Sequence, residues 1–271
     1  MFKISTHTFL YSLLISFSLF QSAASAEVMK VNFAYVGDVN HPALLGVKQG
    51  LEEANLQGQF LNQEYNLDIL SVADISKQDF SNYIAVMAAT NIESFKKLAS
   101  THTSIPVFNL INRADELRTA CIENALHTIP SNRMAKDALA QWHQKKPESR
   151  AEAQAWHHDF VKFAARDLNK RFKKKFDTVM NDYSWAGWAA IKMTSDAVAR
   201  TQINEPDKML HYLKTELSFD GQKGSNMTFR ETGQLRQLLL IVEDNKIATE
   251  APVRGVAKPP TLDSLGTLNC G

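Results

Sequence analysis

The stretch from Lys30 to Phe60 constrains the fold more than any other part of the chain. It begins with the apolar, β-rich run KVNFAYV, which is typical of a strand buried in a parallel sheet. A turn at Gly37-Asp38 follows, and then we expect Asn40 as the N-cap of a helix that has Pro42 in its first turn. The unit is a strand, a loop and a helix. Its loop lies at the carboxyl end of the strand, where open α/β sheets bind their ligands.

The helix of this unit is predicted to pack closely on the sheet. Two glycines, Gly46 and Gly50, fall among its apolar positions and would let one helix face approach the sheet closely. The apolar positions recur at helical spacing: Leu44, Val47, Leu51 and Ala54.

The rest of the chain predicts more strands that alternate with helices. Apolar or alternating runs indicate strands over 65–72, 80–89 and 105–111 and a hairpin over 237–248. A short strand is expected over 227–230. Helices are predicted after Thr90 or Asn91, after Pro130-Ser131, and over 156–176, 185–200 and 206–217. This alternation favours an α/β fold with a parallel sheet and flanking helices, followed by a helical segment and a hairpin.

Residues 1–26 have the layout of a secretory signal. Lys3 precedes an apolar core from Phe9 to Phe20, which is too short to span a bilayer, and Ala24-Ser25-Ala26 comes before Glu27. We therefore expect the exported chain to begin at Glu27. That chain has equal numbers of basic and acidic residues, and a nucleic-acid binder would usually be basic, so nothing favours nucleic acid as a partner.

Two cysteines, Cys121 and Cys270, both lie in polar segments. They form either a disulfide bond or two unpaired thiols. An oxidising, exported location favours the bond, which would tie the C-terminal tail to the middle of the chain. No cysteine and histidine spacing typical of a metal site occurs.

The polar stretch HQKKPESR, residues 143–150, contains Pro147 and no apolar periodicity. It is the best candidate for a hinge between two parts of the chain. After it the sequence leads directly into the helix predicted from Trp156, whose apolar stripe ends at Phe176. The other face of this helix is strongly basic. A solvated helix face is the first interpretation, and an anionic partner surface is the alternative.

The order of these pieces resembles the type I periplasmic substrate-binding proteins, the leucine/isoleucine/valine-binding family of ABC importers. The resemblance rests on the first unit, ALLGVKQGLEEANLQGQF, then CIENALHTIPS, DFVKFAARDLNKRF, DYSWAGWAAIKMTSDAV, FDGQKG and GQLRQLLLIVEDNKI. RADELRTACIENALHTIPSNRMAKDALAQW and LDSLG resemble most closely the branch that accompanies PQQ-dependent alcohol catabolism. In that family two α/β lobes close on a ligand, and this chain is shorter by about one small domain.

The resemblance implies a first lobe over 27–142, a polar hinge over 143–150 and a reduced second lobe. Residues 151–271 would hold helices that return to the first lobe, together with the hairpin and tail. It also implies a periplasmic location, a small polar ligand and an ABC permease in the inner membrane as the partner.

By position, the resemblance places ligand contacts in the loops that end the first strands and at the start of a later helix. The candidate residues are Asp38, Val39, Thr90, Asn109, Tyr183 and Trp185. Asp38 and Asn109 suit turns or caps equally well. Trp188 and His127 are expected to be packed residues. The adjacent His157 and His158 would face different directions on a helix and make a poor metal pair.

No sequence motif supports catalysis. A nucleophile elbow, a Walker loop, an HExxH pair and a two-glycine dinucleotide fingerprint are all missing from the sequence. We therefore expect a binding protein without a cofactor rather than an enzyme. The alternative is a degenerate binding-protein fold that serves a periplasmic dehydrogenase system as an interaction module and transports nothing.

Overall fold

The computed structural model describes residues 27–270, so the predicted signal segment 1–26 lies outside the described residues. Five parallel strands form the main sheet, in the order β2-β1-β3-β4-β5. Their bounds are Met29–Gly37 (β1), Gln63–Leu70 (β2), Ala85–Ala89 (β3), Val107–Asn109 (β4) and Ala125–His127 (β5). The predicted α/β class with a parallel sheet is confirmed.

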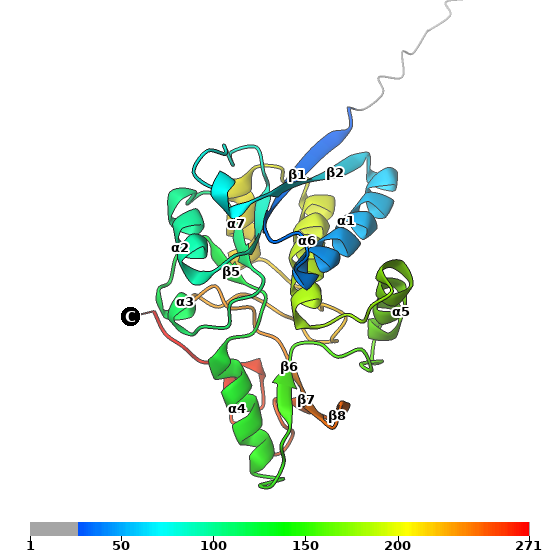
Figure 1. Cartoon of the computed structure of the whole chain (residues 1–271), viewed down its shortest axis with the longest axis vertical. Coiled ribbons are helices and arrows are strands. Elements are labelled where there is room, and N and C mark those ends of the chain that lie inside the picture. Colours follow the sequence, from blue (N-terminus) through cyan, green and yellow to red (C-terminus); the bar gives the residue numbers. More distant parts are fainter. Residues whose placement is uncertain (1–26, 271) are drawn as a thin grey trace, which may run out of the picture.

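Helices cover both faces of this sheet (Figure 1). One face packs against α1, α6 and α7, and the other packs against α2 and α3. Their bounds are Pro42–Leu61 (α1), Ile92–Thr101 (α2), Glu116–Thr119 (α3), Asp182–Thr201 (α6) and Pro206–Thr215 (α7). Because both faces are covered, neighbouring residues of β1 such as Phe33 and Ala34 are both fully buried, which explains the nearly continuous apolar run in the sequence.

A second, antiparallel sheet lies at the lower end of the molecule in Figure 1. Its order is β6-β7-β8, with bounds Glu152–Gln154, Leu239–Glu243 and Lys246–Ala251. The predicted hairpin is therefore confirmed as β7 and β8. Helix α4, Asn132–His143, packs on this sheet through Met134 and Ala138. The segment 227–230, expected as a strand, forms only isolated bridges.

The region after residue 150 differs from the prediction in two ways. Strand β6 precedes the expected helix, and α5 spans Ala165–Phe176 instead of beginning at Trp156. Residues 155–164 form a loop that the Asn169 side chain holds in place. Asn169 accepts from Trp156 Nε1 at 2.7 Å and donates to the Phe160 carbonyl at 3.1 Å. Trp156 and Phe160 are therefore buried from a loop, so their spacing mimics a helical stripe.

The first helix also begins one residue later than expected. Asp38 forms the turn, because its carboxylate accepts from the Asn40 N–H and its carbonyl accepts from the His41 N–H. His41 is the N-cap, and its Nδ1 accepts from the Ala43 N–H at 3.2 Å. Pro42 occupies the first helical position as predicted, where a missing N–H costs no hydrogen bond.

Helices α1 and α6 form the most extensive helix pair among the described residues. A Cβ added to Gly46 would lie 1.7 Å from the Ser184 carbonyl oxygen, and one added to Gly187 would lie 2.3 Å from the Ala43 carbonyl oxygen. The two backbones therefore meet at positions where only glycine fits, and the prediction that Gly46 and Gly50 face the sheet is wrong, because both face α6. This contact joins the first βα unit to a helix about 140 residues later in the chain.

A disulfide bond joins Cys121, just after α3, to Cys270, with the two Cα atoms 5.6 Å apart. Before it reaches α3, the tail is attached to α4. The Gln141 amide donates to Ser264, and the Gly266 N–H donates to Asp137 at 2.8 Å. Both sheets are therefore tied together by the C-terminal tail. Among residues 27–270, no helix combines the length and the apolar character needed to cross a membrane.

The α1–α6 contact predicts that Gly46→Ala destabilises the protein although alanine favours helix formation. The added methyl would force the helix backbones apart, at a cost of about 1–3 kcal/mol in the free energy of unfolding. Urea denaturation measures this change. Lys48→Ala, at an exposed position of the same helix, is the matched control and should leave stability almost unchanged. Equal stability of the two variants would contradict the close contact.

The disulfide bond predicts a second effect on stability. Replacing both cysteines, by Cys121→Ser together with Cys270→Ser, should lower the free energy of unfolding by about 2–4 kcal/mol, because a long loop in the unfolded chain is no longer closed. A non-reducing digest of the original protein should contain one cross-linked peptide pair that reduction separates. Two free thiols in that digest would show that the bond does not form.

Candidate functional site

The carboxyl ends of the parallel strands meet at one edge of the main sheet, and this edge faces β6 of the second sheet. Between them lies a cavity of about 510 Å³, which we call the inter-sheet cavity. It is lined by Arg113 from the loop after β4, Leu139 of α4, residues 151–154, Trp156, and residues 181–183 at the start of α6. Its position matches the usual ligand site of open α/β sheets.

Arg113 and Asp182 form an ion pair on the wall of this cavity. The Asp182 side chain is only 10% exposed, and its other carboxylate oxygen accepts from the Trp156 N–H at 2.8 Å. Arg113 is 26% exposed, so its guanidinium still reaches solvent. The cavity wall therefore presents a fixed carboxylate and a partly accessible cation next to each other, a set that suits a ligand carrying both charges.

The start of α6 fixes the position of Asp182. Asn181 is the N-cap, and its side chain accepts from the Tyr183 and Ser184 N–H groups at 3.1 and 3.0 Å. Tyr183 is half-buried at the cavity, where its ring lies edge-on to His41 with the ring centroids 5.1 Å apart. The cap thus places the aromatic ring of Tyr183, in the first turn of α6, beside the Arg113–Asp182 pair.

Of the six predicted ligand residues, Tyr183 alone lines the inter-sheet cavity. Asp38 and Val39 are exposed at the carboxyl end of β1, and Asp38 forms the turn described above. Thr90 is buried, and its hydroxyl donates to the Asn91 carbonyl at 3.2 Å. These residues lie at the carboxyl edge of the sheet, but the structure does not gather them around one space.

Asn109 is fully buried, and its hydrogen-bonding groups are used within the protein. Its amide oxygen accepts from the Ile111 and Asn112 N–H groups, while its amide nitrogen donates to the Asn112 carbonyl at 2.8 Å. The same nitrogen lies 3.0 Å from His127 Nδ1. These bonds shape the loop that carries Arg113 to the cavity.

Trp185 is fully buried one turn into α6. Its indole stacks on Trp156 at 6.0 Å between ring centroids, and its Nε1 donates to the Gly221 carbonyl at 3.1 Å. Lys223 Nζ lies 3.7 Å above the ring, and burial lowers the pKa of this lysine well below its usual value although Asp182 opposes the shift. Trp185 therefore packs below the cavity wall that Trp156 forms.

Neither Arg113 nor Asp182 was among the residues predicted from the sequence. The only signal available was that Arg113 follows a predicted strand and that Asp182 comes directly before the predicted Tyr183 and Trp185. Nothing in the sequence indicated that the two side chains, 69 residues apart, would meet.

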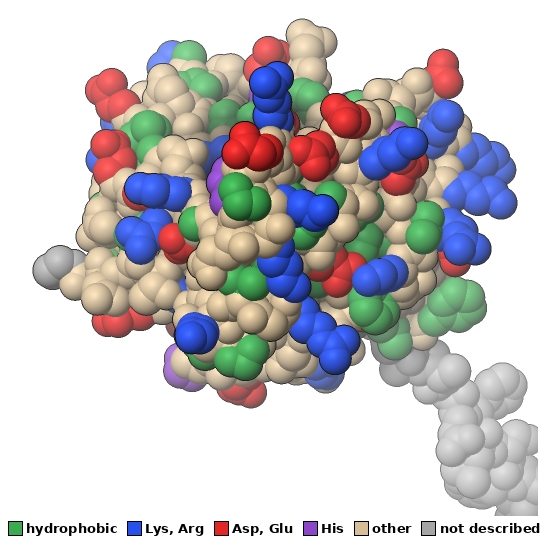
Figure 2. All heavy atoms as spheres, turned by 90° about the horizontal axis from the view of Figure 1, so that it is seen from below, with side chains coloured by type: hydrophobic (Ala, Val, Ile, Leu, Met, Phe, Trp, Pro, Cys, Tyr) green, Lys and Arg blue, Asp and Glu red, His purple; other side chains and the backbone are tan. Residues whose placement is uncertain are grey.

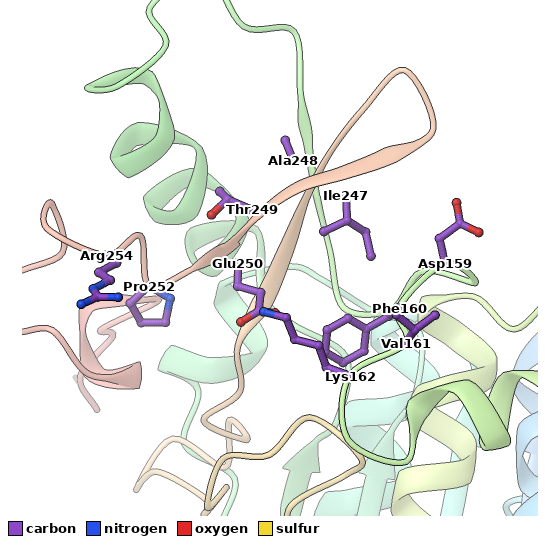
Figure 3. A pocket seen from close by; sticks show the side chains of 10 residues that line it. All are labelled: Asp159, Phe160, Val161, Lys162, Ile247, Ala248, Thr249, Glu250, Pro252 and Arg254. Atoms are coloured by element: carbon purple, nitrogen blue, oxygen red, sulfur yellow. The ribbon is translucent and has the colours of Figure 1, made fainter.

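A second cavity, of about 460 Å³, lies between the loop 159–162 and β8 (Figure 3). In Figure 3 the Lys162 side chain extends toward Glu250, with which it forms an ion pair at 2.6 Å. Phe160 and Ile247 supply apolar lining. No strand end of the parallel sheet contributes to this cavity, so the inter-sheet cavity is the better candidate for the ligand site.

His157, His158 and Asp159 place three possible metal ligands within 4.8 Å of one another. They lie in the loop before α5, so the prediction that His157 and His158 belong to a helix is wrong. The two imidazole rings lie 4.2 Å apart at an interplanar angle of 32°. Both nitrogens of His157 also have partners, the Asp159 N–H and Asn245. This geometry favours a structural role.

Comparison with solved structures gives many matches, whereas no protein-family model and no curated protein sequence matches the chain. A periplasmic ligand-binding protein of a branched-chain amino acid ABC transporter from Burkholderia xenovorans has a TM-score of 0.70 at 12% identity, over 81% of this chain and 95% of that one. An ABC transporter substrate-binding protein from Sphaerobacter thermophilus has a TM-score of 0.67 at 10% identity, over 88% and 100% of the two chains.

A branched-chain amino acid transporter substrate-binding protein from Streptococcus pneumoniae, solved with isoleucine, has a TM-score of 0.62 at 8% identity, over 83% and 99% of the two chains. At such low identity these likenesses describe the fold alone. They confirm that the chain has a fold like that of type I periplasmic binding proteins, as its sequence predicted.

The buried His127 predicts a loss of stability in acid. Burial, with Arg118 as a second cause, holds the pKa of His127 well below its usual value. Below about pH 6.5 the unfolded chain therefore binds a proton that the native state rejects, and the free energy of unfolding falls by up to about 1.4 kcal/mol per pH unit.

Urea denaturation at several pH values measures this slope. The slope should be shallower in His127→Gln, and it should persist in His211→Gln, which removes an exposed histidine as the matched control. Identical slopes in the two variants would show that His127 is not the group responsible.

Proposed function

We propose that this protein is the periplasmic solute-binding component of an ABC importer and that it captures a small polar molecule in the inter-sheet cavity. The observation that carries the proposal is the Arg113–Asp182 pair on the wall of a cavity at the carboxyl edge of the parallel sheet. The shared fold of proteins that serve such importers supports it. Capture of a solute, and not catalysis, is the role that this wall suits.

The charges of the wall select the class of ligand. A zwitterion such as an amino acid would place its carboxylate on Arg113 and its ammonium group on Asp182. Tyr183 would cover the apolar part of the ligand, and Trp156 would form the wall behind it. Such a ligand would separate the Arg113–Asp182 pair and replace it with two new charge contacts. An uncharged solute cannot make these contacts, so it should bind more weakly.

The second sheet and α4 are proposed to act as the reduced second lobe. They form a separate apolar cluster, which faces the main sheet across the inter-sheet cavity. The polar stretch 143–150 connects α4 with β6 inside this cluster. Closure of the cluster over a bound ligand would enclose it and present a changed surface to the permease.

The partner in this proposal is an ABC permease of the inner membrane. A link to PQQ-dependent alcohol oxidation, and the alternative role as an interaction module of a dehydrogenase system, stay predictions from the sequence. Neighbouring genes for an ABC ATPase and permease would favour transport, whereas dehydrogenase and cytochrome genes alone would favour the interaction module.

A thermal-shift screen of the protein from Glu27 onward tests the function. The ligands are amino acids, short-chain alcohols and acids, and quinone cofactors. A ligand that binds only the native state raises the unfolding midpoint by mass action. We expect a saturable shift with one class of charged polar solute. No shift with any class, from a protein that unfolds cooperatively, would contradict the proposal and favour the interaction module.

The same screen tests the site. Arg113→Gln and Asp182→Asn should each weaken binding of the active solute about 10-fold or more, because each removes a charged hydrogen bond. Asparagine at 182 can still accept from the Trp156 N–H, so the wall is retained. The matched control is Arg133→Gln, which breaks the exposed Arg133–Asp137 pair. Unchanged affinity for the solute in both wall variants would show that the ligand binds at another site.

A further inference from the structure

The two flanks of helix α5 carry basic residues in different states. On the flank toward α1, Arg171 binds Glu53 at 2.8 Å and Lys175 pairs with Glu52. These ion pairs, with the buried Leu168 and Phe172 between the flanks, attach the helix to the body of the protein. The positive charges of Arg171 and Lys175 are therefore neutralised by Glu53 and Glu52.

The opposite flank carries an unpaired basic stripe. Its members are exposed and follow the spacing i, i+4 and i+7, which places them along one side of a helix: Arg166, Lys170 and Lys173. Among residues 27–270 none of them has an acidic group within ion-pair distance. Figure 2 shows Lys and Arg side chains gathered at the right edge of the molecule, where α5 lies in Figure 1.

Exposed apolar side chains flank this stripe along the chain. Val161 and Phe163 precede α5 and are 49% and 61% exposed, and Val179 follows it at 43%. The Phe163 ring packs against Gly224, where an added Cβ would lie 2.1 Å from it, and the rest of the ring is exposed. Exposed apolar side chains beside basic ones suit a bilayer surface, where the charges bind lipid phosphates.

The charge of this segment contrasts with that of the whole chain. Residues 161–179 hold seven basic and two acidic side chains, although basic and acidic residues are equal in number from Glu27 onward. Three of the seven, Lys162, Arg171 and Lys175, are paired with glutamates outside the segment, so the other four basic side chains supply the local excess that is not neutralised. It creates a positive field that attracts a surface of opposite charge.

We propose that α5 docks the protein on an anionic phospholipid bilayer. The basic stripe would lie against lipid phosphates, and the apolar residues at its ends would enter the headgroup layer. A bilayer fits better than an acidic protein because the stripe is a row of flexible side chains flanked by apolar ones, without a fixed pocket for one partner group. No residue of α5 lines the inter-sheet cavity, so this docking is separate from the proposed solute capture.

Co-sedimentation with vesicles tests the docking. The protein from Glu27 onward is mixed with vesicles of phosphatidylglycerol and phosphatidylcholine, and separately with vesicles of phosphatidylcholine alone. We expect binding to the anionic vesicles at low salt and its loss in about 0.5 M salt, where charges are screened over a few ångströms. No binding to anionic vesicles at low salt would overturn the proposal and leave an acidic protein as the alternative partner.

The stripe itself is tested by the combined variant Arg166→Gln, Lys170→Gln and Lys173→Gln. Each basic side chain near such a surface contributes about a fivefold change in partition, so the variant should bind about 100-fold more weakly. The matched control removes three exposed lysines from other parts of the surface, Lys77, Lys97 and Lys136, by the same substitution. Equal loss in the two variants would assign binding to overall charge and overturn the proposal.

The same variants separate this inference from the proposed function. Because the three basic residues lie on an exposed face, the stripe variant should keep the unfolding midpoint of the original protein. Any solute that shifts that midpoint should do so equally in both proteins. Binding of the protein to vesicles in the absence of solute therefore tests the docking alone. Binding of a solute in the absence of vesicles tests the proposed function alone.

Discussion

The close contact between α1 and α6 is the constraint on which the rest of the structure depends. At Gly46 and Gly187 the helix backbones approach so closely that no side chain fits between them. This contact brings the start of α6 to the carboxyl edge of the sheet, where Asp182 meets Arg113. A larger residue at either glycine would move the whole N-terminus of α6. The geometry of the cavity wall is thus set by packing outside the cavity.

Much of the main sheet was predictable because its strands are short apolar runs buried on both faces and its helices carry caps and an apolar periodicity. The second sheet was harder to predict. Strand β6 is only three residues long and mostly polar, and its partner β7 lies almost 90 residues later. The start of α5 was wrong because Trp156 and Phe160 keep helical spacing while Asn169 holds their backbone in a loop. Local periodicity does not report such a side-chain bond.

The position of the candidate site at the sheet edge was predictable, whereas of its lining residues only Tyr183 was among those predicted. Loops that end parallel strands share one edge, so Asp38, Thr90 and Asn109 lie at that edge. Their side chains, however, shape turns or are buried. The pair that faces the cavity depends on how the Arg113 loop, itself folded around Asn109, meets the cap of α6. Only a tertiary contact defines that meeting, so single-sequence patterns do not reveal it.

The bond between Cys121 and Cys270 closes the chain into a covalent ring that contains α4 to α7 and the whole second sheet. A protease that cuts inside this ring, for example in the exposed stretch 143–150, opens it but releases no fragment. The pieces stay joined and are also held by the α1–α6 contact. A single cut between Cys121 and Cys270 thus leaves the two pieces covalently joined. A cut before Cys121, in contrast, releases a fragment of the main sheet that no covalent bond holds.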